Sequence, residues 1–272
     1  MTGVRTFASV VALAGALVAA APAAAVITTF ATFNPIGTAS NVNWANSGGS
    51  NAQGTGATFT STATGSSNGV APRLVSFSFL DPSLAGAFSG VTANFTLNAG
   101  LVPPQTALGV AGNTFLIQEG ILGTFSFTTT APIVFNSVFY AAGTNLLSAT
   151  FSGTTVSGFR GSSSAGFNGS TAINPTTITY TSAFLNFGAV LQKDFAIGIS
   201  AVTGPLNAVP TNASPQFALR NFRGVASGNF STDPAPIVTA VPEPAVWGLM
   251  LAGFAMVGFQ ARRRARGTAV TA

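Results

Sequence analysis

The chain of 272 residues has no cysteine and no histidine, and it has five acidic residues against ten basic ones. Without Cys and His it lacks the ligands of the common zinc sites, of haem and of iron–sulfur clusters. The same absence excludes Ser-His-Asp and Cys-His hydrolases and a disulfide scaffold. Charged residues make up 6% of the chain, against about a quarter in a typical soluble domain, so solvated helices are not expected.

Most of the net charge of +5 belongs to the ends of the chain. Between Val26 and Ala240, five bases stand against four acids, which leaves a net charge of +1. Nucleic-acid-binding proteins spread their bases along a groove or stripe, and this segment does not. We therefore expect no nucleic-acid partner.

Residues 1–25 have the pattern of a secretory signal peptide. Arg5 gives a positive start, and Phe7 to Ala19 form an apolar run. Ala23 and Ala25 place small residues where signal peptidase needs them, so the general secretion machinery would export the chain. The alternative is a buried core helix, which rarely ends in an Ala-Pro-Ala-Ala-Ala run. An exported chain without cysteine must rely on core packing for its stability.

A proline-rich linker, residues 233–244, precedes the last apolar segment. It ends in the triad Pro242, Glu243 and Pro244. Prolines fix φ and favour an extended, solvated backbone. Another protein can bind such an extended segment readily.

The residues after the triad predict a transmembrane helix with a cytoplasmic tail. Residues 245–259 form an unbroken apolar run, followed by Gln260 and Ala261. As a helix, residues 245–261 would span about 26 Å, which is short for a bilayer core of about 30 Å but extendable by snorkelling arginines. The tail, residues 262–272, contains the cluster Arg262, Arg263, Arg264 and Arg266. Under the positive-inside rule this tail stays in the cytoplasm, so the rest of the chain lies outside.

The triad, Trp247, the short Gly-rich apolar span and the terminal arginines together resemble the PEP-CTERM protein-sorting signal, in the variant with Trp shortly after the motif. The resemblance implies a Gram-negative bacterium that makes exopolysaccharide, and cleavage by the membrane-embedded exosortase. It implies that Pro242 to Pro244 are recognised and that the arginines stop transfer. Gly248 stands where the variant usually has Ala. The alternative is a plain single-pass anchor.

Residues 26–232 predict an all-β ectodomain. Apolar and polar residues alternate with period two, as in half-buried strands, over residues 74–79, 91–97, 122–127, 133–139, 178–180 and 195–199. Gly and Pro breaks between such runs indicate about ten strands. We expect two packed antiparallel sheets in a jelly-roll-like β-sandwich. The 21 phenylalanines from Phe30 to Phe230 would fill its core.

Residues 38–69 depart from this pattern, because they are rich in Asn, Ser, Gly and Thr. They are either a long surface excursion or two weak edge strands. We favour an ordered but loosely packed region, since disorder usually accompanies a high net charge. Trp44 in this polar stretch is a candidate for stacking on a sugar ring, whereas Tyr140 and Tyr180 are expected in the core or at its rim.

The acidic residues between Val26 and Ala240 do not form a recognisable catalytic or metal-binding pattern. A glycosidase needs two carboxyl groups about 5 to 9.5 Å apart, and Asp81, Asp194 and Asp233 fit a turn, a hairpin and the linker. Glu119 is left without a partner. Clustered acids for calcium and Gly-rich phosphate loops are also missing. We expect no enzyme, no catalytic residue, no metal site and no cofactor.

Two hypotheses remain for the ectodomain. It is a structural or adhesive protein of the cell surface or extracellular biofilm matrix, or it is a membrane-tethered carbohydrate-binding module that uses Trp44. Exopolysaccharide is the expected partner in either case. Soluble β proteins guard their edge strands with lysine, and the ectodomain has one, Lys193, so we also expect self-association. The precursor would be anchored in the inner membrane, and the mature form would lie at the surface or outside the cell.

Overall fold

The structure is a computed structural model, and it describes residues 27–46, 56–62, 69–101, 107–110, 114–210 and 217–239. The first strands and the helix are β1 (Thr28–Pro35), β2 (Val42–Asn46), β3 (Ala57–Ser61), β4 (Arg73–Phe79), α1 (Pro82–Phe88), β5 (Val91–Leu101), β6 (Ala107–Val110) and β7 (Phe115–Thr129). The middle strands are β8 (Ile133–Phe135), β9 (Val138–Tyr140), β10 (Asn145–Phe159), β11 (Ala165–Ser170), β12 (Thr177–Thr181) and β13 (Leu185–Asn186). The last strands are β14 (Gln192–Thr203), β15 (Ala208–Pro210), β16 (Phe217–Leu219), β17 (Phe222–Asp233) and β18 (Ile237–Val238).

These residues form strands because apolar and polar side chains alternate along them. In β5, Ala93, Phe95 and Leu97 are buried, while Asn94 and Thr96 between them point to the other face. The pairings between described strands are antiparallel. The prediction of an all-β, antiparallel fold is confirmed.

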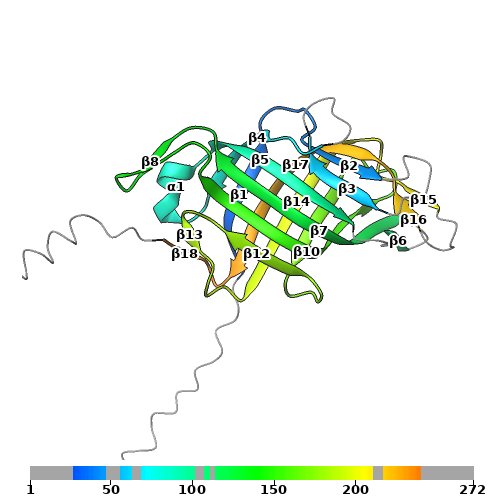
Figure 1. Ribbon diagram of the computed structural model, residues 1–272. Helices are drawn as coiled ribbons and strands as arrows, with labels where there is room; N and C mark the ends of the chain where they lie inside the picture. The colour runs from blue at the N-terminus through cyan, green and yellow to red at the C-terminus, as the bar shows by residue number, and fades with distance from the viewer. Residues whose placement is uncertain are drawn as a thin grey trace, which may run out of the picture.

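Eight strands close into a ring, in the order β1, β4, β5, β7, β10, β11, β14, β17 and back to β1. In Figure 1 the cyan and green strands β5, β7 and β10 lie side by side, and the yellow and orange β14 and β17 cross behind them. The two layers expected of a sandwich are therefore joined by continuous pairing, and the described strands do not divide into two separate large sheets. Each of the eight strands has a partner on both sides.

Strands β2 and β3 complete the wall between β17 and β5 at one end of the ring, and β1 and β4 complete it at the other. For the described parts of residues 38–69, the prediction of a surface excursion or weak edge strands is wrong, because β2 and β3 each pair on both sides. Val42, Trp44 and Phe59 alternate with polar residues and enter the core. The Asn41 side chain ties this corner to β17, since it accepts from the Ala226 N–H at 2.6 Å and donates to the Ala226 carbonyl at 3.1 Å.

Aromatic side chains fill the interior of the closed sheet. Phe127 is fully buried, and its ring centroid lies between 4.9 and 5.9 Å from those of five others, namely Phe33, Phe77, Phe95, Phe125 and Phe230. Rings at these separations add tilted and edge-to-face attraction to the gain from burial. The prediction of a phenylalanine core is confirmed for most of these residues, whereas Phe139 and Phe159 are exposed.

The alternation over residues 133–139 predicts one strand, but the chain forms a hairpin of β8 and β9 there. Asn136 and Ser137 make its two-residue turn with φ of 48° and 61°. Both central residues of a type I′ turn need positive φ, and asparagine tolerates this conformation better than most residues. The alternation of apolar and polar residues therefore continues through the turn, although the chain reverses direction there.

The sequence Asp81-Pro82-Ser83 predicts a turn, and the structure begins α1 at this point. Asp81 is the N-cap, because its Oδ1 accepts a hydrogen bond from the Ser83 N–H at 2.9 Å. Leu84 and Phe88 on one face of this short helix are buried. Within the described ranges, no helix has the length and apolar character to cross a bilayer.

Candidate functional site

The residues of the predicted sorting tail and signal peptide lie outside the described part of the chain. The predicted transmembrane helix, residues 245–261, is among them. So are Pro242, Glu243, Pro244 and Trp247 of the motif, Arg262, Arg263, Arg264 and Arg266 of the cluster, and Ala23 and Ala25 of the cleavage site. The last residue that the structure describes before this tail is Thr239.

The folded body extends into the predicted linker, residues 233–244. Strand β17 runs to Asp233, and Ile237 and Val238 form β18, which pairs with β13. The Thr239 N–H then donates to the Phe184 carbonyl at 2.9 Å. The chain is thus attached to the body three residues before Pro242.

Trp44 is not placed as the sugar-binding hypothesis requires. The structure puts it on β2, fully buried, with its ring stacked on Phe222 at 6.1 Å and tilted against Phe59 at 5.9 Å. A ring with no exposed face cannot stack on a sugar, so the prediction of a surface tryptophan is wrong. The polar neighbours of Trp44 in the sequence hid its alternation with Val42.

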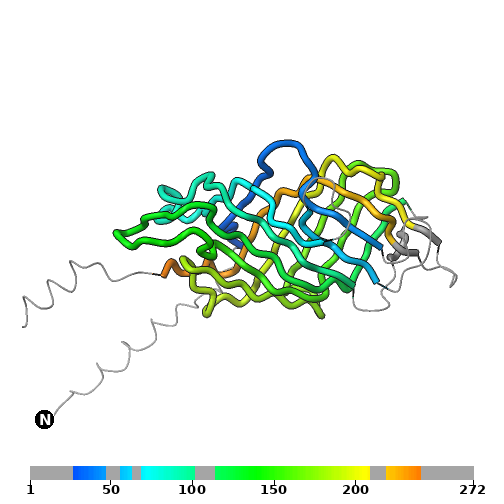
Figure 2. The backbone as a smooth tube through the Cα atoms, turned by 45° about the horizontal axis from the view of Figure 1, so that its top comes forward, coloured from blue at the N-terminus to red at the C-terminus, as the bar shows by residue number. Residues whose placement is uncertain are grey.

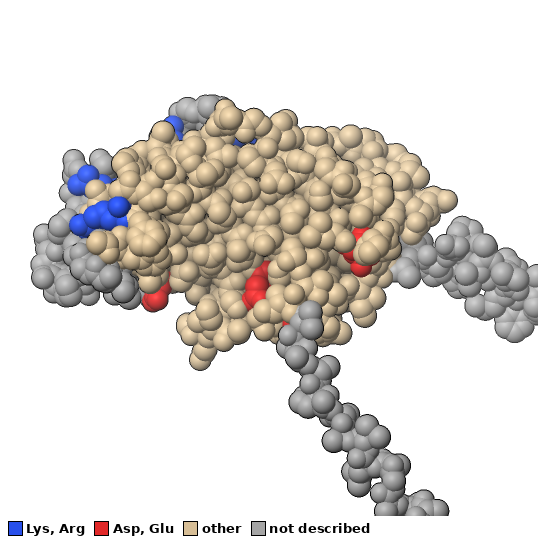
Figure 3. Space-filling model, turned by 180° about the vertical axis from the view of Figure 1, so that it is seen from behind, with Lys and Arg blue, Asp and Glu red and all other residues tan. Residues whose placement is uncertain are grey.

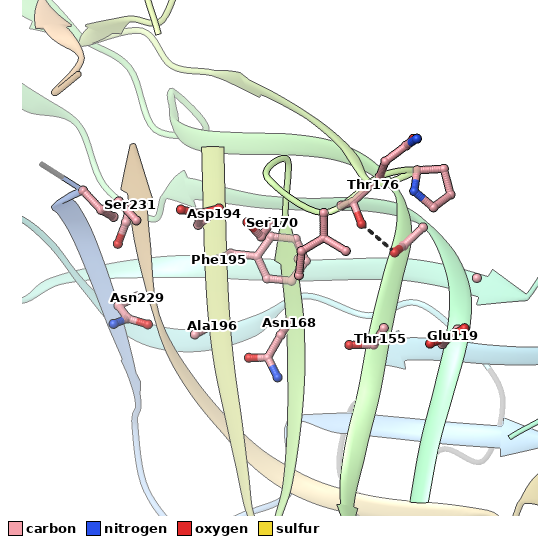
Figure 4. A pocket seen from close by; sticks show the side chains of 17 residues that line it. Glu119, Thr155, Asn168, Ser170, Thr176, Asp194, Phe195, Ala196, Asn229 and Ser231 are labelled. Atoms are coloured by element: carbon pink, nitrogen blue, oxygen red, sulfur yellow. Dashed lines mark hydrogen bonds between the residues drawn. The ribbon is translucent and has the colours of Figure 1, made fainter. Parts of the chain in front are cut away.

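A groove of ≈ 500 Å³ crosses the outer face of the ring over β10, β11, β14 and β17. Two rows of directly opposed residues line it. One row is Thr155, Asn168, Ala196 and Asn229, and the other is Ser170, Asp194 and Ser231. Figure 4 shows the two rows side by side. Their side chains face outward because the alternate residues, among them Phe167, Phe195 and Phe230, are buried in the core.

The segment between β11 and β12 forms one side of the groove. Thr176 is held there because its hydroxyl donates to the Gly153 carbonyl at 2.8 Å, a bond drawn in Figure 4. Ile173 and Pro175 from this segment add apolar surface. Across the groove, Asn168 and Asn229 lie two strands apart, about 10 Å at the usual strand spacing, with the small Ala196 between them.

Asp194 is an acceptor in this groove that is only partly satisfied. Its Oδ2 accepts from Gln192 Nε2 at 2.9 Å, and its main-chain carbonyl accepts from the Tyr180 hydroxyl at 2.6 Å. Its Oδ1 is buried and has no hydrogen-bond partner among the described residues. A buried acceptor without a partner is costly, so Asp194 lowers the stability of this part of the body.

Tyr180 packs beneath Asp194, on the core side of β12. Burial raises the pKa of the Tyr180 phenol well above its ordinary value, and the nearby Asp194 carboxylate raises it further. The tyrosine therefore stays neutral and serves as a fixed donor to β14. This agrees with its expected place in the core.

The structure brings Glu119 and Asp194 to the same groove, which the sequence did not predict. They stand on β7 and β14, which are three strand steps apart through β10 and β11. At the usual spacing this is about 14 Å, beyond the 5 to 9.5 Å between the carboxyl groups of glycoside hydrolases. In the part of the chain that the structure describes, no group of three or more acids is placed to hold a metal ion.

A second outer surface, over β5, β7, β10 and β12, consists of hydroxyl and amide side chains. Two rows of opposed residues cross these four strands. They are Thr96, Ser126, Ser148 and Thr181, and Asn98, Thr124, Thr150 and Thr179. We call them the hydroxyl rows. None of these side chains is buried, and none is charged. Seen from behind in Figure 3, the body is also mostly uncharged, with the visible basic atoms toward one end.

Comparison with known proteins supports the sorting motif in the tail. The family model described as the PEP-CTERM protein-sorting motif matches residues 240–264. This confirms the resemblance that the triad, Trp247 and the arginines indicated. Neither the curated proteins nor the solved structures gave a match to the chain.

Proposed function

Because the chain carries a PEP-CTERM protein-sorting motif, we propose that it is an exported precursor, cut by exosortase, whose body becomes a structural or adhesive component of the cell surface or of an exopolysaccharide matrix. Signal peptidase would remove residues 1–25, and the apolar segment 245–261 would hold the precursor in the inner membrane until the tail is cut. The motif at residues 240–264 is the observation that carries this proposal.

The surface of the body supports an adhesive role. The hydroxyl rows offer donors and acceptors across four strands without any charge. Such a surface can exchange water for the hydroxyl groups of a neutral polymer at many points, and no charge has to be desolvated. Adhesion would thus arise from many weak contacts in place of one tight site.

Self-association would have to use short strands. Closure of the ring gives the long strands partners on both sides, whereas β12 pairs with β10 alone and β15 with β16 alone among the described strands. Thr177, Thr179 and Thr181 are the exposed residues of β12. A second copy pairing along β12 would extend the hydroxyl rows from one molecule to the next.

We expect the processed body in the matrix or the medium when a culture is separated into cytoplasm, inner membrane, cell surface, matrix and medium. An antibody against the body would locate it, and digestion of the exopolysaccharide should shift it from the matrix to the medium. A body found wholly in the inner membrane would contradict the proposed role.

Carbohydrate binding in the groove is the second candidate function, and the outward-facing asparagines of its lining favour it. Asn168 and Asn229 would bond the edges of a sugar with amide groups that both donate and accept. Ile173 and Pro175 would contact its C–H face. With Asp194 and Glu119 at the groove, a neutral polysaccharide fits better than an anionic one.

The double substitution Asn168→Ala and Asn229→Ala should weaken binding of the purified precursor to a neutral glucan at least tenfold, because each lost bond to the ligand contributes about 1 kcal/mol. Calorimetry with neutral glucan and anionic alginate would measure it. Asn94→Ala, an asparagine of β5 that lies outside both the groove and the hydroxyl rows, is the matched control. Equal binding by all three proteins, or tighter binding to alginate, would argue against the groove.

A further inference from the structure

The hairpin of β8 and β9 presents an apolar pair to solvent. Val134 and Phe139 are opposed across its two strands, and each is 67% exposed. Directly opposed side chains on one face of an antiparallel pair touch each other, so the two form one continuous apolar patch. The chain has no charged residue between Glu119 and Arg160, and the hairpin lies within this interval.

The other face of the hairpin fixes it to the body. The Phe135 ring lies 5.4 Å from Phe88 of α1 and 6.3 Å from Phe184, and the Tyr140 ring lies 4.7 Å from Phe184. Ile133 also packs against the core. Val134 and Phe139 therefore face solvent from a fixed position, because the alternate residues of the same two strands pack against the body.

The hairpin lies at the end of the body from which the chain continues toward its apolar tail. Phe184, which contacts both strands of the hairpin, accepts the hydrogen bond from Thr239. Figure 2 shows the green hairpin projecting from the end of the body where the orange trace stops. From Thr239 to Ala245, where the apolar run begins, are six residues, which reach about 20 Å when extended.

We propose that Val134 and Phe139 insert into the lipid surface of the membrane that holds the uncut precursor. This rests on the proposed membrane-anchored precursor. A tether of six residues keeps this end of the body next to the bilayer, so weak insertion by two side chains is favoured by the high effective concentration. Valine and phenylalanine without neighbouring charge suit the boundary between headgroups and acyl chains.

Insertion would orient the body and depend on the tail. The hairpin end would face the bilayer, with the triad Pro242 to Pro244 close to the surface where a membrane-embedded protease works. The opposite end, where β7 begins, would point away. Once the tail is cut the effective concentration is lost, and a patch of two side chains is too small to hold the body. Cleavage would then release it.

The absence of cysteine allows a direct test, because a single introduced cysteine can be labelled uniquely. The full precursor, as Phe139→Cys or Val134→Cys with an environment-sensitive fluorophore, is reconstituted into phosphatidylcholine and phosphatidylglycerol vesicles. We expect a blue-shifted emission and at least twofold quenching by lipids that carry a nitroxide high on the acyl chain. The second position keeps the test valid if one variant fails to fold.

Phe159→Cys is the matched control. Phe159 is 64% exposed and pairs with Phe115 at the start of β7, whereas the hairpin follows the end of β7. Strand β7 runs for fourteen residue steps from Phe115 to Thr129, so the two positions lie about 45 Å apart along this strand. A label at position 159 should emit as in water and resist lipid quenching.

Flotation of the vesicles separates the two ways of failing. A precursor that floats with the vesicles but gives the same water-like emission at positions 134, 139 and 159 overturns the hairpin proposal alone. A precursor that does not float overturns the membrane-anchored precursor, and the hairpin proposal with it.

Discussion

Replacing Phe127 by alanine is expected to lower the free energy of unfolding by about 3 to 5 kcal/mol. Phe127 is fully buried and its ring contacts five other phenylalanines drawn from β1, β4, β5, β7 and β17. Truncation loses the transfer energy of the ring and leaves a cavity that rings fixed on separate strands cannot fill. In a body of this size we expect the Tm to fall by about 10 °C.

Phe139→Ala is the control for this prediction, because Phe139 is 67% exposed on the hairpin. Its removal should change the free energy of unfolding by at most about 0.5 kcal/mol. Denaturant and thermal unfolding of the purified precursor, followed by circular dichroism, would compare the two. Similar losses in the free energy of unfolding for both variants would mean that the buried Phe127 side chain does not stabilise the closed sheet.

The class of the fold could be predicted from the sequence, because alternation of period two shows directly in strands such as β4, β5 and β7. Alternation gives the faces of a strand but carries no information on its neighbours. Closure into a ring depends on pairs such as Thr29 with Ser231, two residues from opposite ends of the chain. For that reason two separate sheets were as consistent with the sequence as the closed one.

Some strands were hidden by residues that usually mark loops. Strand β11 reads Ala-Gly-Phe-Asn-Gly-Ser, and the run from Gly161 to Gly169 predicts a break. A Cβ at Gly169 would lie 2.7 Å from the ring of Phe195, so this glycine is required by close packing inside the sheet. Likewise β2 and β3 lie in a Ser- and Asn-rich stretch whose few apolar residues, Trp44 and Phe59, were enough to anchor them.

The sorting motif could be predicted from sequence because it is local, with its triad, apolar run and arginines in one stretch. The groove could not, since its rows combine Thr155, Asn168, Ala196 and Asn229 from four strands. Each of these residues alone is a solvent-facing polar or small residue, as strands of this kind have throughout. Strand order was needed to bring them together and to place Glu119 beside them.

Glu243→Ala is expected to abolish removal of the tail. In the resemblance to PEP-CTERM proteins this carboxylate is the central residue of the recognised triad. The prolines on both sides are expected to favour an extended backbone that a protease can bind. The wild type should lose the residues after about position 244, whereas the variant should keep them and stay in the membrane. Glu119→Ala is the matched control, because it removes the other glutamate of the chain, an exposed one, and should leave cleavage unchanged.

Intact-mass analysis of the protein from the envelope and medium of its own host tests the central claim most directly. We predict a wild-type product that starts at Val26 and ends near Pro244, and a Glu243→Ala product that starts at the same residue and runs through Ala272. If both proteins retain the tail through Ala272, the segment is a plain anchor and the account of an exosortase-processed surface protein is contradicted.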